Sequence, residues 1–250
     1  MSLIPILSPK KFKPSDVPGL GLWLESDWGV TRDGLNAVSS WLDRSVNGYD
    51  FTQAVGANQP IWTAGEFGGN AGLIFDGTND SLEISVANPF STSQSFTFFV
   101  VLKAQVNDND ENYFSMGDLG SSDNFVLYKQ GIVGTNPAVT FSVLSGIVND
   151  VRGNTAINDN ISHLFISESN GSAWSERIDR INQTLTVTGA NSGIAPGDYT
   201  TLDNITIGVI RRSGVFFVRS NFAAILFYTS QISTGDRSKV ENYLIDKYRV

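Results

Sequence analysis

The stretch Ala223–Tyr248, AAILFYTSQISTGDRSKVENYLIDKY, passes within a few residues from an apolar, strand-like segment into a helix. Ser233 is placed to cap that helix, and Asp236 completes an S-x-x-D capping box with an acid near the positive helix end. Apolar residues then recur at offsets of three, four and eight, at Val240, Tyr243, Leu244 and Tyr248. This spacing predicts one apolar helix face, which we expect to pack against the rest of the protein as a structural element.

From Gly19 onward the chain is a series of short runs rich in Phe, Val, Ile and Thr, bounded by Gly, Asn, Asp and Ser. Several runs alternate apolar with polar residues, as SLEISV does at Leu82, Ile84 and Val86, which is typical of an antiparallel sheet with one buried face. The predicted strands are Leu20–Glu25, Gly72–Gly77, Ser81–Val86, Ser95–Lys103, Tyr113–Gly117, Asn124–Gln130, Ala138–Leu144, His163–Ser169, Gln183–Gly189, Asn204–Arg212 and Val215–Tyr228. Because no helices alternate with them, they favour an all-β sandwich of two antiparallel sheets with a C-terminal α-helix.

Residues 1–18 differ from the rest, because they hold four of the eight prolines and show no hydrophobic periodicity. They predict an extended, Pro-rich N-terminal arm, with a disordered tail as the alternative. The arm contains the one basic cluster of the chain, PKKFKP around Lys10–Lys13, a tract that more often aids solubility than binds a polyanion. Residues 19–250 contain no repeat and no linker, so we expect a single domain there.

Composition excludes several classes of function. The net charge of -8 and a pI near 4.6 argue against nucleic acid as a partner, since that affinity depends on clustered Lys and Arg. With no cysteine and one histidine, the usual zinc, haem and iron–sulfur sites and every cysteine nucleophile are unavailable to the chain. The N-terminal sequence has neither the pattern of a signal peptide nor that of a membrane span, so no membrane insertion is expected.

Five segments form a recognisable series: PGLGLWLESD (Pro18–Asp27), VSSWLDRSVNGYDF (Val38–Phe51), LIFDGTNDSLEI (Leu73–Ile84), SFTFFVVLK (Ser95–Lys103) and the terminal stretch quoted above. The most specific parts are W-x-D-x-S-x-N-G at Trp41–Gly48 and YLIDKY at Tyr243–Tyr248. In order and spacing the series resembles the concanavalin A-like lectin/glucanase superfamily, and within it the laminin G-like jelly rolls found in phage virion proteins and bacterial surface proteins. The resemblance covers nearly all of residues 18–250 and implies a concanavalin A-like jelly roll there. It leaves function open, because such folds serve as lectins, glycosidases, carbohydrate-binding modules and structural domains.

Catalytic patterns are absent from the sequence. A retaining glucanase on this fold would carry E-x-D-x-x-E along one strand, whereas here Glu25 and Asp27 come nearest and lack the third acid. His163 is the one available imidazole base, and without a G-x-S-x-G motif we interpret it as a structural residue. We therefore predict no catalytic residues and no enzymatic activity.

Binding residues are predicted from aromatic and acidic side chains near strand ends and in loops. The candidate glycan contacts are Trp28, Tyr113, Trp174 and Tyr199, with packing in the core or rim as the alternative for each. No cofactor is predicted. Calcium is the one metal ion for which the sequence offers ligands. The candidate ligands are Asp108, Asp110 and Glu111 in an acidic loop, and a solvated acidic turn is the alternative interpretation of that loop.

The resemblance, the absent catalytic pattern and the Pro-rich arm together predict a non-catalytic structural protein of a phage virion. It would be a tail-fibre, tail-tip or head-decoration component that contacts other virion subunits through its arm, forms a homo-oligomer, and could bind host surface glycans. Its expected location is the virion, after synthesis in the host cytoplasm without a signal peptide. The alternative is a free-standing carbohydrate-binding lectin or adhesion module, and a glycoside hydrolase is the least favoured possibility.

Overall fold

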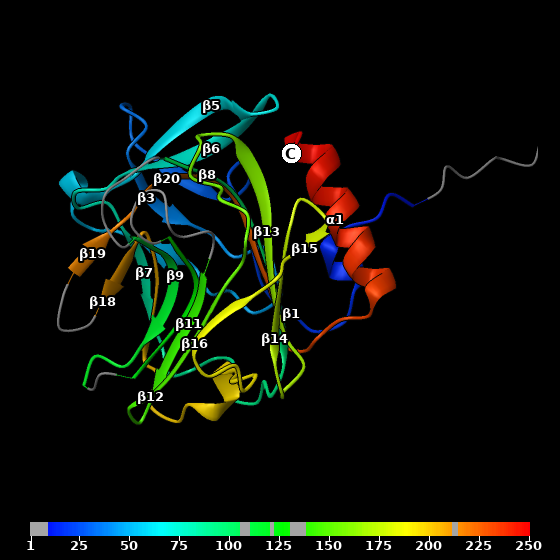
Figure 1. Ribbon diagram of the computed structural model, residues 1–250. Coiled ribbons are helices and arrows are strands. Elements are labelled where there is room, and N and C mark those ends of the chain that lie inside the picture. Colours follow the sequence, from blue (N-terminus) through cyan, green and yellow to red (C-terminus); the bar gives the residue numbers. More distant parts are fainter. Residues whose placement is uncertain (1–9, 106–110, 121–122, 131–138, 212–214) are drawn as a thin grey trace, which may run out of the picture.

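The computed structural model describes residues 10–105, 111–120, 123–130, 139–211 and 215–250. In these residues two antiparallel sheets pack face to face, and one α-helix lies outside the sandwich (Figure 1). The predicted all-β sandwich with a C-terminal helix is thereby confirmed. No helix among the described residues is long and apolar enough to cross a membrane.

The first sheet has eight strands, and its centre is β20 (Arg219–Tyr228). Along one edge, β20 pairs with β6 in its N-terminal part and with β1 in its C-terminal part. Along its other edge it pairs with β8 over nearly its whole length. The pairing Leu20↔Tyr228 thus joins the beginning of the domain to its last strand. The other strands of this sheet are β1 (Leu20–Glu25), β5 (Ile61–Phe67), β6 (Asn70–Asp76), β8 (Phe96–Ala104), β13 (Ser162–Ser169), β14 (Trp174–Ile178) and β15 (Ile181–Asn182).

The second sheet has ten strands, in the order β16-β12-β11-β10-β9-β17-β7-β4-β3-β2. A short hairpin of β18 (Val209–Arg211) and β19 (Val215–Phe217) continues from β17. The strands of the second sheet are β2 (Val30–Arg32), β3 (Val38–Trp41), β4 (Phe51–Thr52), β7 (Leu82–Ser85), β9 (Glu111–Gly117), β10 (Asn124–Gln130), β11 (Val139–Leu144), β12 (Ile147–Arg152), β16 (Thr186–Gly189) and β17 (Asn204–Ile207). The described 3₁₀ turns are Pro14–Asp16, Gly56–Asn58 and Pro196–Asp198.

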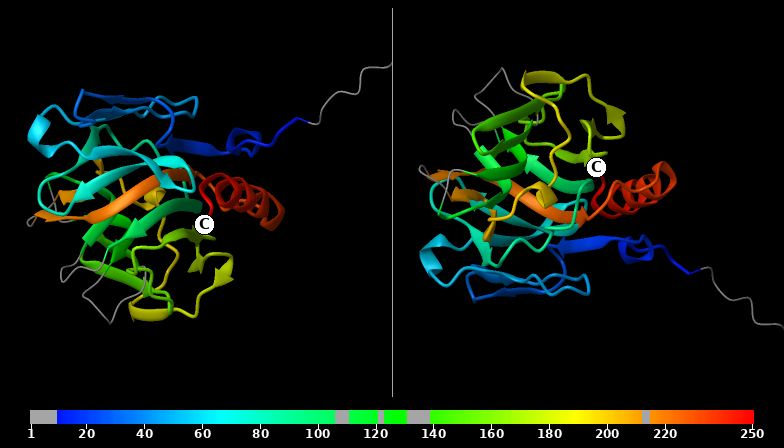
Figure 2. Two further views of the ribbon diagram at one scale, coloured as in Figure 1. Left: turned by 90° about the horizontal axis from the view of Figure 1, so that it is seen from above. Right: turned by 90° about the horizontal axis from the view of Figure 1, so that it is seen from below.

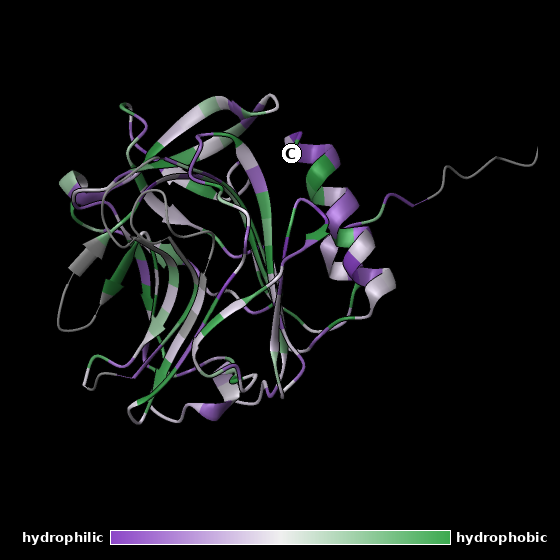
Figure 3. Cartoon of the chain, viewed as in Figure 1, coloured by the Kyte–Doolittle hydropathy of each residue, from purple (hydrophilic) through white to green (hydrophobic). Residues whose placement is uncertain are grey.

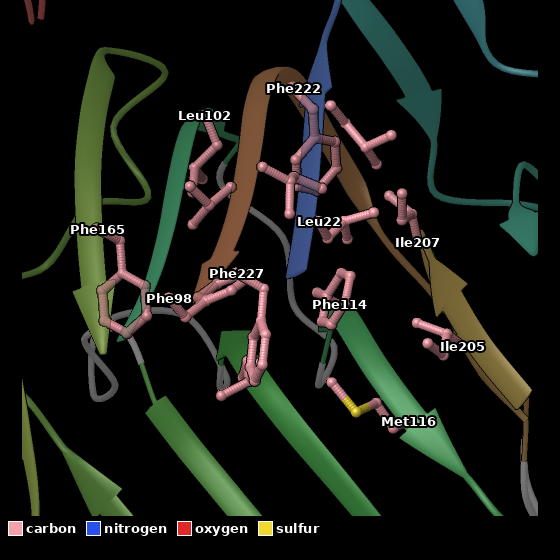
Figure 4. Packing of buried hydrophobic residues seen from close by; sticks show 14 of the residues in the cluster. Leu22, Phe98, Leu102, Phe114, Met116, Phe165, Ile205, Ile207, Phe222 and Phe227 are labelled. Atoms are coloured by element: carbon pink, nitrogen blue, oxygen red, sulfur yellow. The ribbon is translucent and has the colours of Figure 1, made fainter. Parts of the chain in front are cut away.

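Two hydrophobic cores lie on opposite faces of the first sheet. Between the sheets, rings such as Phe98, Phe114 and Phe227 pack together (Figure 4). On the outer face, Phe99 and other alternate residues pack against the helix. Because β8 is buried on both faces, its sequence is a nearly continuous apolar run instead of an alternating one.

The helix α1 (Thr234–Tyr248) covers this outer face, and its residues range from strongly apolar to strongly polar (Figure 3). As predicted, Ser233 is its N-cap and accepts a hydrogen bond from the Asp236 backbone at 3.1 Å. Of the four residues of the predicted apolar face, three are buried at the sheet, namely Val240, Leu244 and Tyr248. Tyr243 instead lies at the edge of this contact and is partly exposed.

Several predicted strands differ in extent from the observed ones. The predicted strand at residues 204–212 is broken at Gly208, whose φ is +86° and where an added Cβ would lie 2.3 Å from the Phe75 ring. This position therefore requires glycine and divides β17 from β18. The predicted strand at residues 215–228 is likewise two strands, β19 and β20. Seven strands of the described chain were not predicted, namely β2, β3, β4, β5, β12, β14 and β15.

The described part of the arm is not fully extended, since Pro14–Asp16 form a 3₁₀ turn. Pro14 is buried, and its carbonyl accepts a hydrogen bond from the Tyr228 hydroxyl at 3.0 Å. Two views of the chain show the arm running beside α1 (Figure 2). Residues 10–18 are thus attached to the first sheet next to the helix.

Candidate functional site: a cationic and aromatic groove

A groove of about 820 Å³ lies between the arm, β1 and α1. The arm contributes Lys11, Phe12 and Lys13, while the body of the sandwich contributes a tryptophan, an arginine and an asparagine. The complete lining, called the arm–helix groove below, is Lys11, Phe12, Lys13, Trp23, Arg44, Asn70, Lys239, Asn242, Tyr243, Asp246 and Lys247. Its three main segments are far apart in the sequence and meet because β1 pairs with β20, which leads directly into α1.

The helix contributes to the groove through one regular face. Lining residues at 239, 242, 243, 246 and 247 follow the spacing of neighbours on a single side of an α-helix. The buried residues at 240, 244 and 248 form the adjacent side, which packs on the first sheet. The same hydrophobic contact that fixes the helix therefore also fixes the orientation of its groove-lining side chains.

Three aromatic rings form one wall of the groove. Tyr243 packs edge-on against Phe12 and against Trp23, with ring centroids 6.4 Å apart in both pairs. Trp23 is almost fully buried, whereas Phe12 and Tyr243 are half-buried and offer part of their rings to the groove. Such partly exposed rings are suited to the C–H faces of sugar rings.

Beneath this wall lies an ionic network centred on Glu25, whose side chain is fully buried. Its carboxylate pairs with Arg44 and with the Lys247 ammonium at 3.0 Å, and it accepts a hydrogen bond from the Tyr243 hydroxyl at 2.7 Å. Lys247 also contacts Asp27 at 3.0 Å. Burial, together with the neighbouring Glu25 charge, raises the pKa of Tyr243, so that its hydroxyl keeps the proton it donates. The network links β1, the segment after β3 and the C-terminal part of α1.

Charge is strongly concentrated at the groove. Five of the eleven lining residues are Lys or Arg and one, Asp246, is acidic. The whole chain has the opposite balance, with 17 basic and 25 acidic residues. The groove is therefore a local cationic region on an acidic protein.

Trp28 is the sequence-predicted aromatic residue that lies next to the groove. The residue is 39% exposed. The Arg44 guanidinium lies over both the Trp23 and Trp28 rings, 4.4 and 5.4 Å from their centroids. This cation–π arrangement connects Trp28 to the groove wall.

Two other predicted glycan contacts are core residues in the structure, which corrects the expectation for them. Trp174 is 2% exposed and donates from its indole nitrogen to the Ile194 carbonyl at 2.7 Å. Tyr199 is 1% exposed, hydrogen-bonds with Ser142, and packs edge-on against Phe125. A ring buried between the sheets has no face to offer to a sugar.

The fourth aromatic candidate and the predicted calcium loop fall largely outside the described residues. Asp108 and Asp110 lie outside them altogether. Glu111 and Tyr113 are described only as backbone of β9. Among the side chains that the structure describes, no group of three His, Cys, Asp or Glu residues is placed to hold a metal ion.

His163, predicted to be structural, is held between two carboxylates. Its Nδ1 lies 2.7 Å from Asp179 and its Nε2 lies 3.1 Å from Asp159. Burial alone would lower the pKa of His163, but the hydrogen bonds and charges of the two aspartates raise it overall. With both ring nitrogens engaged, the imidazole has none free for a substrate.

Another buried carboxyl, that of Glu176, lies between the sheets. Glu176 on β14 is 2% exposed, and the Thr140 backbone N–H and hydroxyl donate to its Oε1 at 3.0 and 2.9 Å. Burial is the main cause that raises the pKa of Glu176 to about 8, against the lowering effect of the Thr140 hydrogen bonds. This residue does not line the groove and belongs to the core.

Most groove residues were not predicted from the sequence. The arm lysines stand out as a basic cluster, but such a tract is typical of a solubilising surface, and the helical spacing places Tyr243 on the buried face. Arg44 lies within the motif W-x-D-x-S-x-N-G, which supports the family resemblance but does not indicate a binding role for the arginine. A usable signal is that Asn242, Asp246 and Lys247 follow Lys239 at offsets of three, seven and eight, which places these polar residues on the helix face next to the apolar one.

Comparison with known proteins identifies the fold and no family. No protein-family model matches the chain, and no curated protein matches it. Among solved structures, Trypanosoma rangeli sialidase in complex with sialic acid is similar at a TM-score of 0.60 with 12% identity, over 92% of this chain and 33% of the sialidase. The binding domain of botulinum neurotoxin serotype D/C is similar at a TM-score of 0.59 with 12% identity, over 93% of this chain and 53% of that domain.

A structure of botulinum neurotoxin type C, whose cell entry depends upon interaction with two ganglioside molecules, is similar at a TM-score of 0.60 with 11% identity and covers the same shares of the two chains. The chain thus spans about a third of the sialidase and about half of the toxin chains. At these identities the similarity shows a shared β-sandwich fold. It supports the sandwich implied by the sequence resemblance, while the narrower phage laminin G-like type finds no support in these structures.

Proposed function

We propose that this chain is a carbohydrate-binding module, a lectin-like domain without catalytic activity of its own. The observation that supports this most directly is the arm–helix groove, where partly exposed aromatic rings lie beside cationic and amide side chains. Sugar sites commonly combine an apolar ring for the C–H face with polar groups for the hydroxyls. The shared fold adds support, because the sialidase was solved with sialic acid and the type C neurotoxin interacts with gangliosides.

The absence of catalysis is part of this proposal and is argued from the carboxylates. Most glycoside hydrolases place two carboxyl groups on either side of the scissile bond. The lining of the groove includes one carboxylate, Asp246. Glu25 lies below the groove surface, where Arg44, Lys247 and Tyr243 occupy its oxygens. A carboxylate held in this way is poorly placed to act on a substrate.

The virion role predicted from the sequence stays a prediction, as do the homo-oligomer and the docking of the arm on other subunits. The known structures with this fold favour the alternative, a carbohydrate-binding module, over a purely architectural part. The two roles would coincide in a receptor-binding virion protein, for which the groove would be the binding site.

A glycan array tests the proposed function. The wild-type chain should bind a restricted set of glycans, and Phe12→Ala should weaken that binding about tenfold, as expected for one aromatic contact of about 1.4 kcal/mol. Leu35→Ala is the matched control, because Leu35 is 82% exposed and does not line the groove. An array on which the wild-type chain binds nothing would refute the proposal.

A further inference from the structure

We infer that the ligand of the arm–helix groove is an acidic glycan, and that the ammonium groups of Lys11, Lys13 and Lys239 receive its carboxylate or sulfate group. This inference rests on the proposed function and specifies the substrate class of the same site. Two observations support it. The charged lining residues are mainly cationic, and only some of these cations are neutralised by carboxylates of the protein itself.

Two of the five cations are occupied. Arg44 and Lys247 both pair with the buried Glu25, so their charges stabilise the protein's own carboxylate. Lys247 is further balanced by Asp27. These two cations shape the floor of the groove and contribute little net charge to a ligand.

The other three cations lie at the rim with their charge available. Lys11 and Lys13 are exposed and line the groove, and the ion pair of the neighbouring Asp16 is made with Lys10, so that Lys13 acts on Asp16 only at longer range. Lys239 pairs with Asp236 one helical turn away at 2.8 Å, with its side chain 59% exposed. Exposed pairs of this kind contribute little to stability, so a ligand anion can compete for this ammonium.

The hydrogen-bonding groups of the groove are also biased toward an acceptor-rich ligand. A lysine ammonium donates three hydrogen bonds and accepts none. The Asn242 Oδ1 accepts from the Arg180 guanidinium, which leaves the amide N–H groups of Asn242 to donate. Beside these donors stand the rings of Phe12 and Tyr243. A sugar ring that carries an anionic group matches both features, whereas a neutral sugar offers the ammonium groups no opposite charge.

Carboxylated and sulfated sugars share this chemistry, and matched acid–neutral pairs distinguish them. The full chain is titrated with 3′-sialyllactose and lactose, and with chondroitin sulfate and its desulfated form, at low and high salt. The acidic member of at least one pair should bind at least about tenfold more tightly, with an advantage that shrinks as salt screens the charges. Whether the sialylated or the sulfated pair shows the preference identifies the anionic group.

The double variant Lys11→Gln and Lys13→Gln tests the residues. It should lose most of the preference for the acidic member, while its affinity for the neutral member falls by a much smaller factor. The matched control is Lys10→Gln, because Lys10 lies in the same arm, pairs with Asp16 and does not line the groove. Binding by this control should equal that of the wild type.

Three outcomes would overturn the inference. Equal binding of the acidic and neutral members removes the acidic-glycan inference but leaves the proposed function intact. Binding to no glycan at all removes both. Binding of random single-stranded DNA as tight as that of the acidic glycans would show a general polyanion site instead.

Discussion

Replacing Glu176 by glutamine should remove much of the pH dependence of the protein's stability. The folded-state pKa of Glu176 is raised to about 8 from an ordinary value of 4.5. Between these two values the folded protein retains a proton that the unfolded chain has released, so the free energy of unfolding falls as the pH rises. At about 1.4 kcal/mol per unit, the loss from pH 5 to pH 8 is at most about 4 kcal/mol.

Glutamine resembles the protonated carboxyl in shape and cannot ionise. The Thr140 N–H and hydroxyl can still donate to its oxygen, as they do to Glu176 Oε1. We therefore expect Glu176→Gln to match the wild type within about 1 kcal/mol at pH 5 and to be more stable than it at pH 8. The raised pKa of His163 also makes stability decline as the pH rises, but it does so equally in both chains and cancels in the difference.

Urea unfolding at pH 5, 6, 7 and 8 measures this difference. Asp246→Asn is the control, because it removes a carboxylate at an exposed position, and the stability of this variant should stay parallel to that of the wild type. If Glu176→Gln and the wild type gave parallel stability curves from pH 5 to pH 8, the assignment of a proton to Glu176 would be refuted.

Three further substitutions test the packing of the fold by urea or thermal unfolding. Glu25→Gln should cost about 3 kcal/mol because it removes the buried charged partner of Arg44 and leaves Lys247 paired with Asp27 alone, whereas Asp27→Asn, at a site 35% exposed, should cost less than about 1 kcal/mol. An equally small effect of both would contradict the central place of Glu25 in the network. Gly208→Ala should destabilise the protein by about 2 kcal/mol or more, since it combines a positive φ with a clash against a buried phenylalanine ring, and Gly34→Ala, where the space is open, should be nearly neutral. Ser233→Ala should lower stability by about 1 kcal/mol through loss of the N-cap, and an unchanged midpoint would show that packing alone holds the helix.

The sequence predicted the fold well where the burial pattern is simple. The predicted bounds of β1 and β10 are the observed ones, and the cap and core-facing side of α1 were also predicted. Strands such as β5 were missed because most of their residues are exposed or half-exposed, so they show no regular apolar alternation. In β14 the inward positions include Glu176 as well as Trp174 and Ile178, and a charged residue in an inward position hides the pattern.

The groove could not be predicted in the same way. Its residues come from the arm, β1, the segment after β3, the start of β6 and α1, and they meet through pairing between strands that are far apart in the sequence. Lys239, Asn242 and Asp246 form a polar helix face that, in sequence alone, resembles any solvated surface. Trp174 is buried because it occupies an inward position of β14, where buried and exposed residues alternate. A nearby turn in the sequence does not show which positions of the strand face inward.

The pairing of β1 with β20 affects how the polypeptide folds during its synthesis. The Tyr228 hydroxyl contacts the Pro14 carbonyl across 214 positions of sequence, and the middle strand of the first sheet is also its last. Until β20 leaves the ribosome, β1, β6 and β8 each lack the strand that joins them. Contacts at such long sequence separation slow folding and leave strand edges unpaired in the nascent chain. Chains truncated before residue 219 should accordingly aggregate or be degraded, because the central strand of the first sheet is missing from them.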